Sequence, residues 1–244
     1  MLGAGPDRHG QDRGEVVRMG GLAEAQVADA IESVARRDVA LAKAVVERDN
    51  RLDALHRDIE KKAIRLIALR QPVASDLRRT LGAMKLASDL ERTGDLAKNI
   101  AKRALILAEA EPMQPLTRSI ERMGRLVSNR LRDVLDAYTA SEIERALSVW
   151  QTDDEVDEHY NALFRELLTY MMGDPRTITA CTHLLFMAKN LERIGDHATN
   201  IAETVHYEIT GEDMLGERPK AVPGPGEEPT PTPHLSASPD AADD

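Results

Sequence analysis

Acidic side chains recur along this chain at intervals of four residues, a spacing that lets several carboxylates bind one cation. Two groups of oxygen-bearing side chains share this spacing: Glu91, Asp95 and Asn99, and then Glu192, Asp196 and Asn200. Residues four apart lie on the same face of an α-helix. Carboxylate and amide oxygens suit hard cations such as Mg²⁺, Mn²⁺ or oxidised iron ahead of structural zinc. The pattern therefore predicts an oxygen-rich face on each of two helices.

The two groups belong to a segment that occurs twice. Residues 90–101 and 191–202 are identical at nine of twelve positions, at a constant offset of 101 and without a gap. Such a match indicates an internal duplication. It divides the chain into two related units of roughly 100 residues, each long enough to bury a core of its own.

A second acidic pair precedes each repeated segment. Pro72 and Pro175 mark short turns, so the helices on either side of each turn must run antiparallel. Residues at equal distances from such a turn lie side by side, which predicts four carboxylates at one level in each hairpin. The predicted clusters are Asp49, Asp53, Glu91 and Asp95 in the first unit, and Asp153, Asp157, Glu192 and Asp196 in the second.

These acids are expected to flank the apolar seam between the helices and to line a surface groove. Glu91 and Asp53, for example, each follow a leucine of that seam. Clustered carboxylates repel one another, so a hard cation, basic groups of a partner or local arginines must neutralise them. Arg92 and Arg193 adjoin the glutamates in sequence and therefore point about 100° away around the helix.

Further residues near the clusters have different expected roles. Auxiliary ligands are predicted at Asn99, Asn200, Asp89 and Asp154. His197 follows a predicted ligand, but its counterpart in the first unit is Leu96, so a surface position is expected. Gly94 and Gly195 each destabilise a helix interior by about 1 kcal/mol relative to alanine. Because glycine occupies this position in both repeats, close packing between helices is expected there.

The elements that must position these residues are helices, because residues between the prolines are mostly strong helix formers. The predicted fold class is all-α, with two tandem up-down three-helix bundles related by duplication. The six helices are expected at 15–36, 39–70, 74–109, 116–138, 142–171 and 176–210. The predicted organisation is a flexible arm (1–14), a first repeat (15–109), a linker (110–115), a second repeat (116–211) and a disordered, proline-rich acidic tail (212–244).

Composition excludes several classes of function. The net charge is −10, of which the segment 212–244 contributes −6, so the folded part carries only −4 and lacks the basic character of a nucleic-acid-binding protein. No apolar stretch is long enough for membrane insertion, and the start of the chain does not resemble a signal peptide. Cys181 is the sole cysteine and is expected to be buried. These features predict a cytoplasmic protein.

Two stretches, Gln71-Pro72-Val73-Ala74-Ser75-Asp76-Leu77-Arg78 and residues 89–97, resemble the PhoU family. The resemblance covers residues 12–211. It implies multinuclear metal clusters of Fe, Mn or Mg at the eight acids of the two clusters. It also implies a non-enzymatic negative regulator of phosphate uptake and phosphate-starvation signalling. Its partners would be the ATPase subunit of a phosphate ABC transporter and a sensor histidine kinase, which would hold it at the inner face of the membrane.

The sequence is also compatible with two functions other than a metal-binding regulator. A helical-bundle metalloenzyme, either a phosphoesterase or a redox protein, would use the same acids for catalysis, although no nucleophile–base pair accompanies them. A metal-free helical adaptor would use the acids to bind a basic partner. A homodimer formed through exposed helix faces is compatible with each alternative. The second turn, Gly173-Asp174-Pro175-Arg176, departs from the family pattern because it lacks the Gln-Pro pair.

Overall fold

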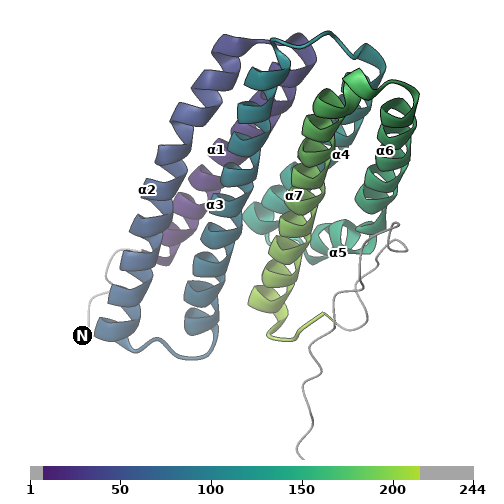
Figure 1. Cartoon of the computed structure of the whole chain (residues 1–244). Coiled ribbons are helices and arrows are strands. Elements are labelled where there is room, and N and C mark those ends of the chain that lie inside the picture. The colour runs from purple at the N-terminus through teal and green to yellow at the C-terminus, as the bar shows by residue number, and fades with distance from the viewer. Residues whose placement is uncertain (1–7, 215–244) are drawn as a thin grey trace, which may run out of the picture.

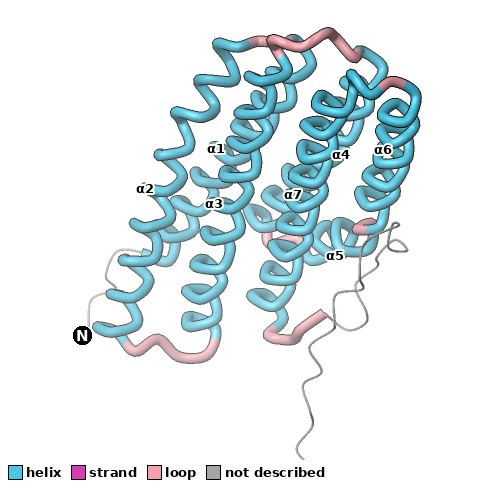
Figure 2. Tube along the Cα trace, in the orientation of Figure 1, coloured by secondary structure: helices cyan, strands magenta, loops and turns pink. Residues whose placement is uncertain are grey.

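The structure is a computed structural model that describes residues 8–214, and this part of the chain is almost entirely helical (Figures 1 and 2). The all-α prediction is confirmed. The helices are α1 (Arg8–Arg36), α2 (Val39–Arg70), α3 (Ser75–Leu107), α4 (Gln114–Ala140), α5 (Ile143–Gln151), α6 (Asp154–Gly173) and α7 (Ile178–Thr210), with a short 3₁₀ turn at Pro175–Thr177 before α7.

The helices form two antiparallel groups that correspond to the two repeats. In Figure 1, α1, α2 and α3 lie together on one side, and α4 to α7 lie on the other. The groups join through α3 against α7 and through α1 against α4. The two bundles predicted from the duplication are therefore present, and a common apolar core connects them.

The apolar seam identified in each repeat forms the centre of this core. Leu86, Leu90 and Ile100 of α3 are fully buried, and so are Leu191 and Ile201 of α7. Burying a large aliphatic side chain contributes about 1.5–3 kcal/mol. Because the seam residues occupy alternating steps of three and four, α3 and α7 each bury a continuous stripe and hold their acidic residues at its edge.

Turn residues fix the length of the first hairpin. Asp38 caps the start of α2, where its carboxylate accepts the Leu41 backbone N–H at 2.9 Å. The helix ends at Arg70. The next residue, Gln71, caps it in a left-handed conformation, and Pro72 follows. Ala74 also has a positive φ of 47° before α3 begins. These features confirm an antiparallel α2–α3 hairpin.

The prediction of one continuous helix over 142–171 is wrong. The helix is interrupted at Thr152 and Asp153, which separate α5 from α6. Arg130 of α4 donates to the carbonyl of Val149 at 2.5 Å and also to the carbonyl of Thr152. In an unbroken helix the Val149 carbonyl would accept the N–H of residue 153. The arginine takes that place, and the second unit has two shorter helices where the first has one.

The ends of the described region differ in part from expectation. Helix α1 begins at Arg8, within the segment predicted to be a flexible arm, so the first helix is longer than the predicted 15–36. Residues 1–7, and all but the first three residues of the predicted tail, lie outside the described residues. Within residues 8–214, none of the helices combines the length and the apolar character that a membrane span requires.

Candidate functional site

The first acidic cluster lies between α2 and α3, and Asp49 forms its buried end. Its side chain is only 4% exposed. The side-chain amide nitrogen of Gln26, on α1, donates to Asp49 Oδ1 at 3.0 Å and to the backbone carbonyl of Gly94 at 3.1 Å. The expectation that all four acids line a surface groove is therefore wrong for Asp49, which three helices enclose.

Lys98 supplies the positive charge of this cluster. Its ammonium donates to Asp49 Oδ2 and to Asp95 Oδ1, joining the two helices of the hairpin. Burial disfavours the charged ammonium, but the two carboxylates outweigh it and raise the pKa of Lys98 above its usual value. The predicted pairing of Asp49 with Asp95 is confirmed, and the neutralising group is a lysine that the sequence analysis did not consider.

Asp53 and Glu91 form the more exposed end of the first cluster, and both are half-buried. Burial raises the pKa of Glu91, and the negative charges of Asp95 and Asp53 raise it further, while His56 opposes the shift. The three acids are therefore close enough to repel, as the register of the hairpin predicts.

The second cluster repeats this arrangement around Asp153, whose side chain is 5% exposed. The hydroxyl of Thr199 donates to Asp153 Oδ1 at 2.6 Å, and Arg130 lies 3.7 Å from the same oxygen. Asp153 is the residue that precedes α6, and its backbone keeps helical torsion angles of φ −61° and ψ −35°. Its carboxylate is buried, so the expectation that the acids line a surface groove is wrong for Asp153 as it is for Asp49.

Glu192 is the most strongly perturbed acid of the second cluster. Burial and the nearby charge of Asp196 raise its pKa to about 7, and Lys189 opposes this shift. Lys189 donates to Glu192 Oε1 at 3.1 Å. The other oxygen, Oε2, is buried without a hydrogen-bond partner among the described residues. Asp157 also raises this pKa, so the second hairpin crowds its carboxylates as expected.

The two repeated glycines allow the hairpin helices to approach closely. A Cβ atom on Gly94 would fall well inside van der Waals distance of the Leu52 side chain. On Gly195 it would lie 3.3 Å from Val156, the residue equivalent to Leu52. Both glycines therefore serve helix packing, as expected, and the first tolerates a side chain less well than the second.

Sequence reasoning missed the residues that hold the two buried aspartates, although a signal for them exists. Gln26 and Arg130 are separated by 104 positions, the same offset that relates Asp49 to Asp153. Lys98 and Thr199 are separated by 101 positions, the offset of the repeated segment. Comparing every polar residue at these offsets would have found both pairs of donors.

The auxiliary ligands predicted around the clusters lie in varied surroundings. Asn99 is exposed, whereas Asn200 and Asp154 are half-buried. Asp89 faces the other unit, where its carboxylate lies 2.8 Å from His197 Nδ1 in the contact between α3 and α7. The prediction of a surface histidine is wrong: His197 is only 9% exposed because α3 covers it.

The two clusters offer oxygen donors of the kind that hard cations bind, but the donors are not arranged as a coordination shell in this structure. Within the part of the chain that the structure describes, no group of three or more His, Cys, Asp or Glu residues is placed to hold a metal ion. The donors are oxygens, one Glu192 oxygen has no described partner, and two glutamates are crowded. By donor type and charge these residues fit a hard cation.

Comparisons with known proteins agree with this arrangement. The family model of the PhoU domain matches residues 16–104 and 120–205, which contain both clusters. The phosphate-specific transport system accessory protein PhoU homolog of Caulobacter vibrioides is 70% identical over 206 residues, covering 84% of this chain and 90% of the relative. The phosphate-specific transport system accessory protein PhoU of Escherichia coli is 41% identical over 202 residues, 83% of each protein.

Two solved structures share the fold. PhoU from Pseudomonas aeruginosa aligns with a TM-score of 0.81 at 40% identity, covering 83% of this chain and 97% of that one. The phosphate transport system regulatory protein PhoU from Streptococcus pneumoniae aligns with a TM-score of 0.78 at 31% identity, covering 85% and 98%. These names describe accessory and regulatory proteins, in agreement with the prediction of a regulator that is not an enzyme. The chain belongs to the PhoU family, as the resemblance of residues 71–78 and 89–97 indicated.

Proposed function

We propose that this protein is a cytoplasmic negative regulator of phosphate uptake and phosphate-starvation signalling, whose two acidic clusters bind hard metal ions. The names of the relatives, which describe accessory and regulatory proteins of phosphate transport, support the first part. The observation that carries the second part is Glu192, a buried and crowded carboxylate with one oxygen that has no described partner.

The metal ions would be Fe, Mn or Mg, held by the carboxylates of each hairpin. The first site would use Asp49, Asp53, Glu91 and Asp95, and the second Asp153, Asp157, Glu192 and Asp196. When bound, such an ion supplies positive charge that offsets the repulsion among the acids. The chain's own contribution is orientation, because Gln26 fixes Asp49 and Thr199 fixes Asp153.

Lys98 sets a condition for metal binding in the first unit. Its ammonium lies between the carboxylates of Asp49 and Asp95 and pairs with both. A metal ion held by these two carboxylates would have to replace the lysine. In the second unit Arg130 also donates to two backbone carbonyls, so it would stay in place beside Asp153 if the four acids held an ion.

The proposed partners are the ATPase subunit of a phosphate ABC transporter and a sensor histidine kinase. These partners would hold the protein at the inner face of the membrane, and a homodimer is the proposed state in solution. A strain that lacks this protein should take up phosphate without restraint and should express starvation genes in high phosphate. Unaltered uptake and unaltered expression in that strain would contradict the regulatory proposal.

Metal binding is tested separately on the purified full chain. Elemental analysis without chelator is expected to find Fe, Mn or Mg in stoichiometric amount, and Mn²⁺ should raise the melting temperature because it binds the native state. Glu91→Gln combined with Glu192→Gln should abolish the rise. Glu109→Gln combined with Glu158→Gln, two exposed acids outside the clusters, is the matched control and should keep it.

A metal-free adaptor is the second candidate, favoured by the lysine and arginine that already pair with the buried aspartates. The variant Lys98→Met separates the two proposals. If Lys98 only competes with a metal ion, this variant should bind Mn²⁺ more tightly than the wild type. An absence of metal in both proteins, with melting temperatures that ignore Mn²⁺, Mg²⁺ and Fe³⁺, would favour the adaptor.

A further inference from the structure

One end of the α2–α3 hairpin is strongly basic in a protein that is acidic as a whole. Residues 57–85 contain eight Arg or Lys and three Asp or Glu, a net charge of +5, so the rest of the chain carries −15. The equivalent part of the second unit, residues 161–186, contains two residues of each sign and is neutral. The duplication therefore does not account for this charge.

The cations are accompanied by exposed aliphatic side chains on the same surface. Ile64 and Arg65 follow Lys61 by three and four residues, which places both beside Lys61 on one face of α2. Ile64 is 59% exposed, and Leu69, close to the end of the helix, is 71% exposed. Val73 extends this surface into the turn and is 75% exposed. Basic and apolar groups are thus interleaved rather than separated.

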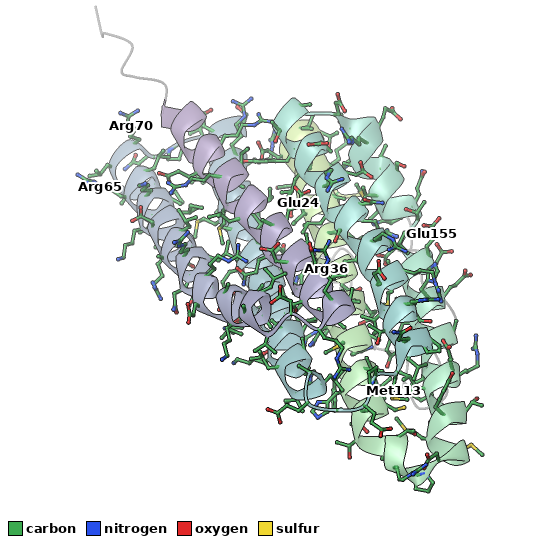
Figure 3. The ribbon with its side chains drawn as sticks, turned by 90° about the horizontal axis from the view of Figure 1, so that it is seen from above. Glu24, Arg36, Arg65, Arg70, Met113 and Glu155 are labelled. Atoms are coloured by element: carbon green, nitrogen blue, oxygen red, sulfur yellow. The ribbon has the colours of Figure 1, made fainter. Side chains whose placement is uncertain are left out.

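This surface lies at one end of the molecule. Figure 1 shows the α2–α3 turn at one end of the bundle, and Figure 3 shows Arg65 and Arg70 projecting outward from the end of α2. A projecting end cannot enclose a peptide, whereas it can rest on a flat surface. We name it the basic hairpin end and define it by Lys61, Ile64, Arg65, Leu69, Arg70 and Val73.

We propose that the basic hairpin end docks directly on an anionic lipid surface. Lysine and arginine near such a surface are attracted to its negative headgroups, by about fivefold in affinity for each charge. The interleaved aliphatic groups add contact at the boundary between headgroups and acyl chains. The acidic remainder of the chain is repelled by the same surface, so the charge distribution orients the molecule with this hairpin end toward the lipid.

A nucleic acid fits this surface less well. Its phosphates would satisfy the cations, but Ile64, Leu69 and Val73 would lie against a polar backbone without burial. The acidic segment 215–244 of this chain is a stronger competitor, because the chain leaves α7 close to the hairpin: a Cβ atom on Gly211 would lie 3.1 Å from Arg78 Cζ. That segment is poor in large apolar residues, so it matches the charge of the surface and leaves its aliphatic part unmatched.

The test is flotation of the purified full chain with vesicles. Binding is expected to an equimolar mixture of phosphatidylcholine and phosphatidylglycerol, and not to phosphatidylcholine alone. The triple variant Lys61→Gln, Arg65→Gln, Arg70→Gln should weaken binding by roughly a hundredfold. The variant Leu69→Ser combined with Val73→Ser should weaken it less and should make the remaining binding more sensitive to salt.

The matched control neutralises three exposed cations near the opposite end of the bundle: Lys43→Gln, Lys102→Gln and Arg118→Gln. It changes the net charge equally and should retain wild-type binding. Circular dichroism of each variant confirms that it is folded. Equal loss of binding in the control and in the hairpin variant would overturn the proposal, because the attraction would then depend on net charge alone.

A second full-length variant tests the acidic segment as the occupant: Glu227→Gln, Glu228→Gln, Asp240→Asn, Asp243→Asn and Asp244→Asn. If the wild type fails to bind the anionic vesicles and this variant binds them, the acidic segment covers the hairpin end and the proposal is wrong for the intact chain. Comparable binding by both proteins supports the lipid as the occupant. The measurement requires neither metal nor a transporter, so its result is independent of the proposed regulatory function.

Discussion

Each unit contains one buried aspartate that is paired with a charged and a neutral donor. The helices that supply the charged and the neutral donor are exchanged between the two units. In the first unit, Asp49 takes a neutral amide from the first helix of its repeat and a cation, Lys98, from the third. In the second, Asp153 takes a cation, Arg130, from the first helix and a neutral hydroxyl, Thr199, from the last. Each buried carboxylate therefore keeps one cation and one neutral donor, although the residues that supply them differ.

This exchange changes what each cation can do. Lys98 is 22% exposed and is shared between Asp49 and the more exposed Asp95, so it can be displaced toward solvent. Arg130 is 6% exposed and also binds the carbonyls at the break between α5 and α6. Lys98 is thus held only by side-chain carboxylates and partly contacts solvent, whereas Arg130 also stabilises the backbone at the helix break.

The largest expected effect comes from removing the buried arginine. Arg130→Ala should lower the free energy of unfolding by about 3–5 kcal/mol, because it removes the cation beside the buried Asp153 carboxylate and leaves two carbonyls without their arginine donor. Gln26→Ala should lower it by about 1–3 kcal/mol, since Asp49 retains Lys98. Urea denaturation measures both values, and the exposed Arg132→Ala is the control. Equal losses for Arg130→Ala and Gln26→Ala would contradict the distinction between the two units.

The next effect concerns the two equivalent glutamates and depends on pH. The folded-state pKa of Glu192 is about 7, above the ordinary value of 4.5, so the native state binds the proton more tightly than the unfolded state. The stability contribution of this group therefore falls as pH rises from about 4.5 to about 7. In chelator at about pH 8, Glu192→Gln should raise the free energy of unfolding by up to about 3 kcal/mol.

Glu91→Gln should act in the same direction with a smaller gain, because Glu91 is half-buried and water screens its neighbours. Both gains should vanish below about pH 4, where both states are protonated. Denaturation curves across this pH range measure the difference. If Glu192→Gln instead destabilised the protein in chelator at about pH 8, the fold would stabilise the ionised carboxylate. The pKa of Glu192 would then be lowered rather than raised.

The smallest effect separates the two repeated glycines. Gly94→Ala forces Leu52 to move within a packed core, which costs about 1–3 kcal/mol, and the gain of about 1 kcal/mol in helix propensity only partly offsets it. Gly195→Ala meets Val156 at 3.3 Å, where a shift of a few tenths of an ångström relieves the contact, so its net effect should be close to zero. Thermal denaturation measures both, and equal losses would mean that the two hairpins are packed equally tightly.

The helical fold and the pairing of the acidic residues were predictable from the sequence because both depend on local periodicity and hairpin register. Asp49 and Asp95 are equidistant from the Pro72 turn, and Lys98 joins them in the structure. The helix break at Asp153 was not predictable from local propensity, because Arg130 stabilises it from another helix. The burial of His197 depends in the same way on α3, which belongs to the other unit.

The sequence by itself determined the duplication, the all-α class, the family and the residues that form each acidic cluster, since these follow from repeated residues and helical spacing. Only the tertiary structure decided which carboxylates are buried and which cations neutralise them. The reason is that burial and charge pairing arise from contacts between helices far apart in the chain. Lys98 and Thr199 are equivalent in the duplicated segment, yet one is a shared cation and the other a buried hydroxyl donor.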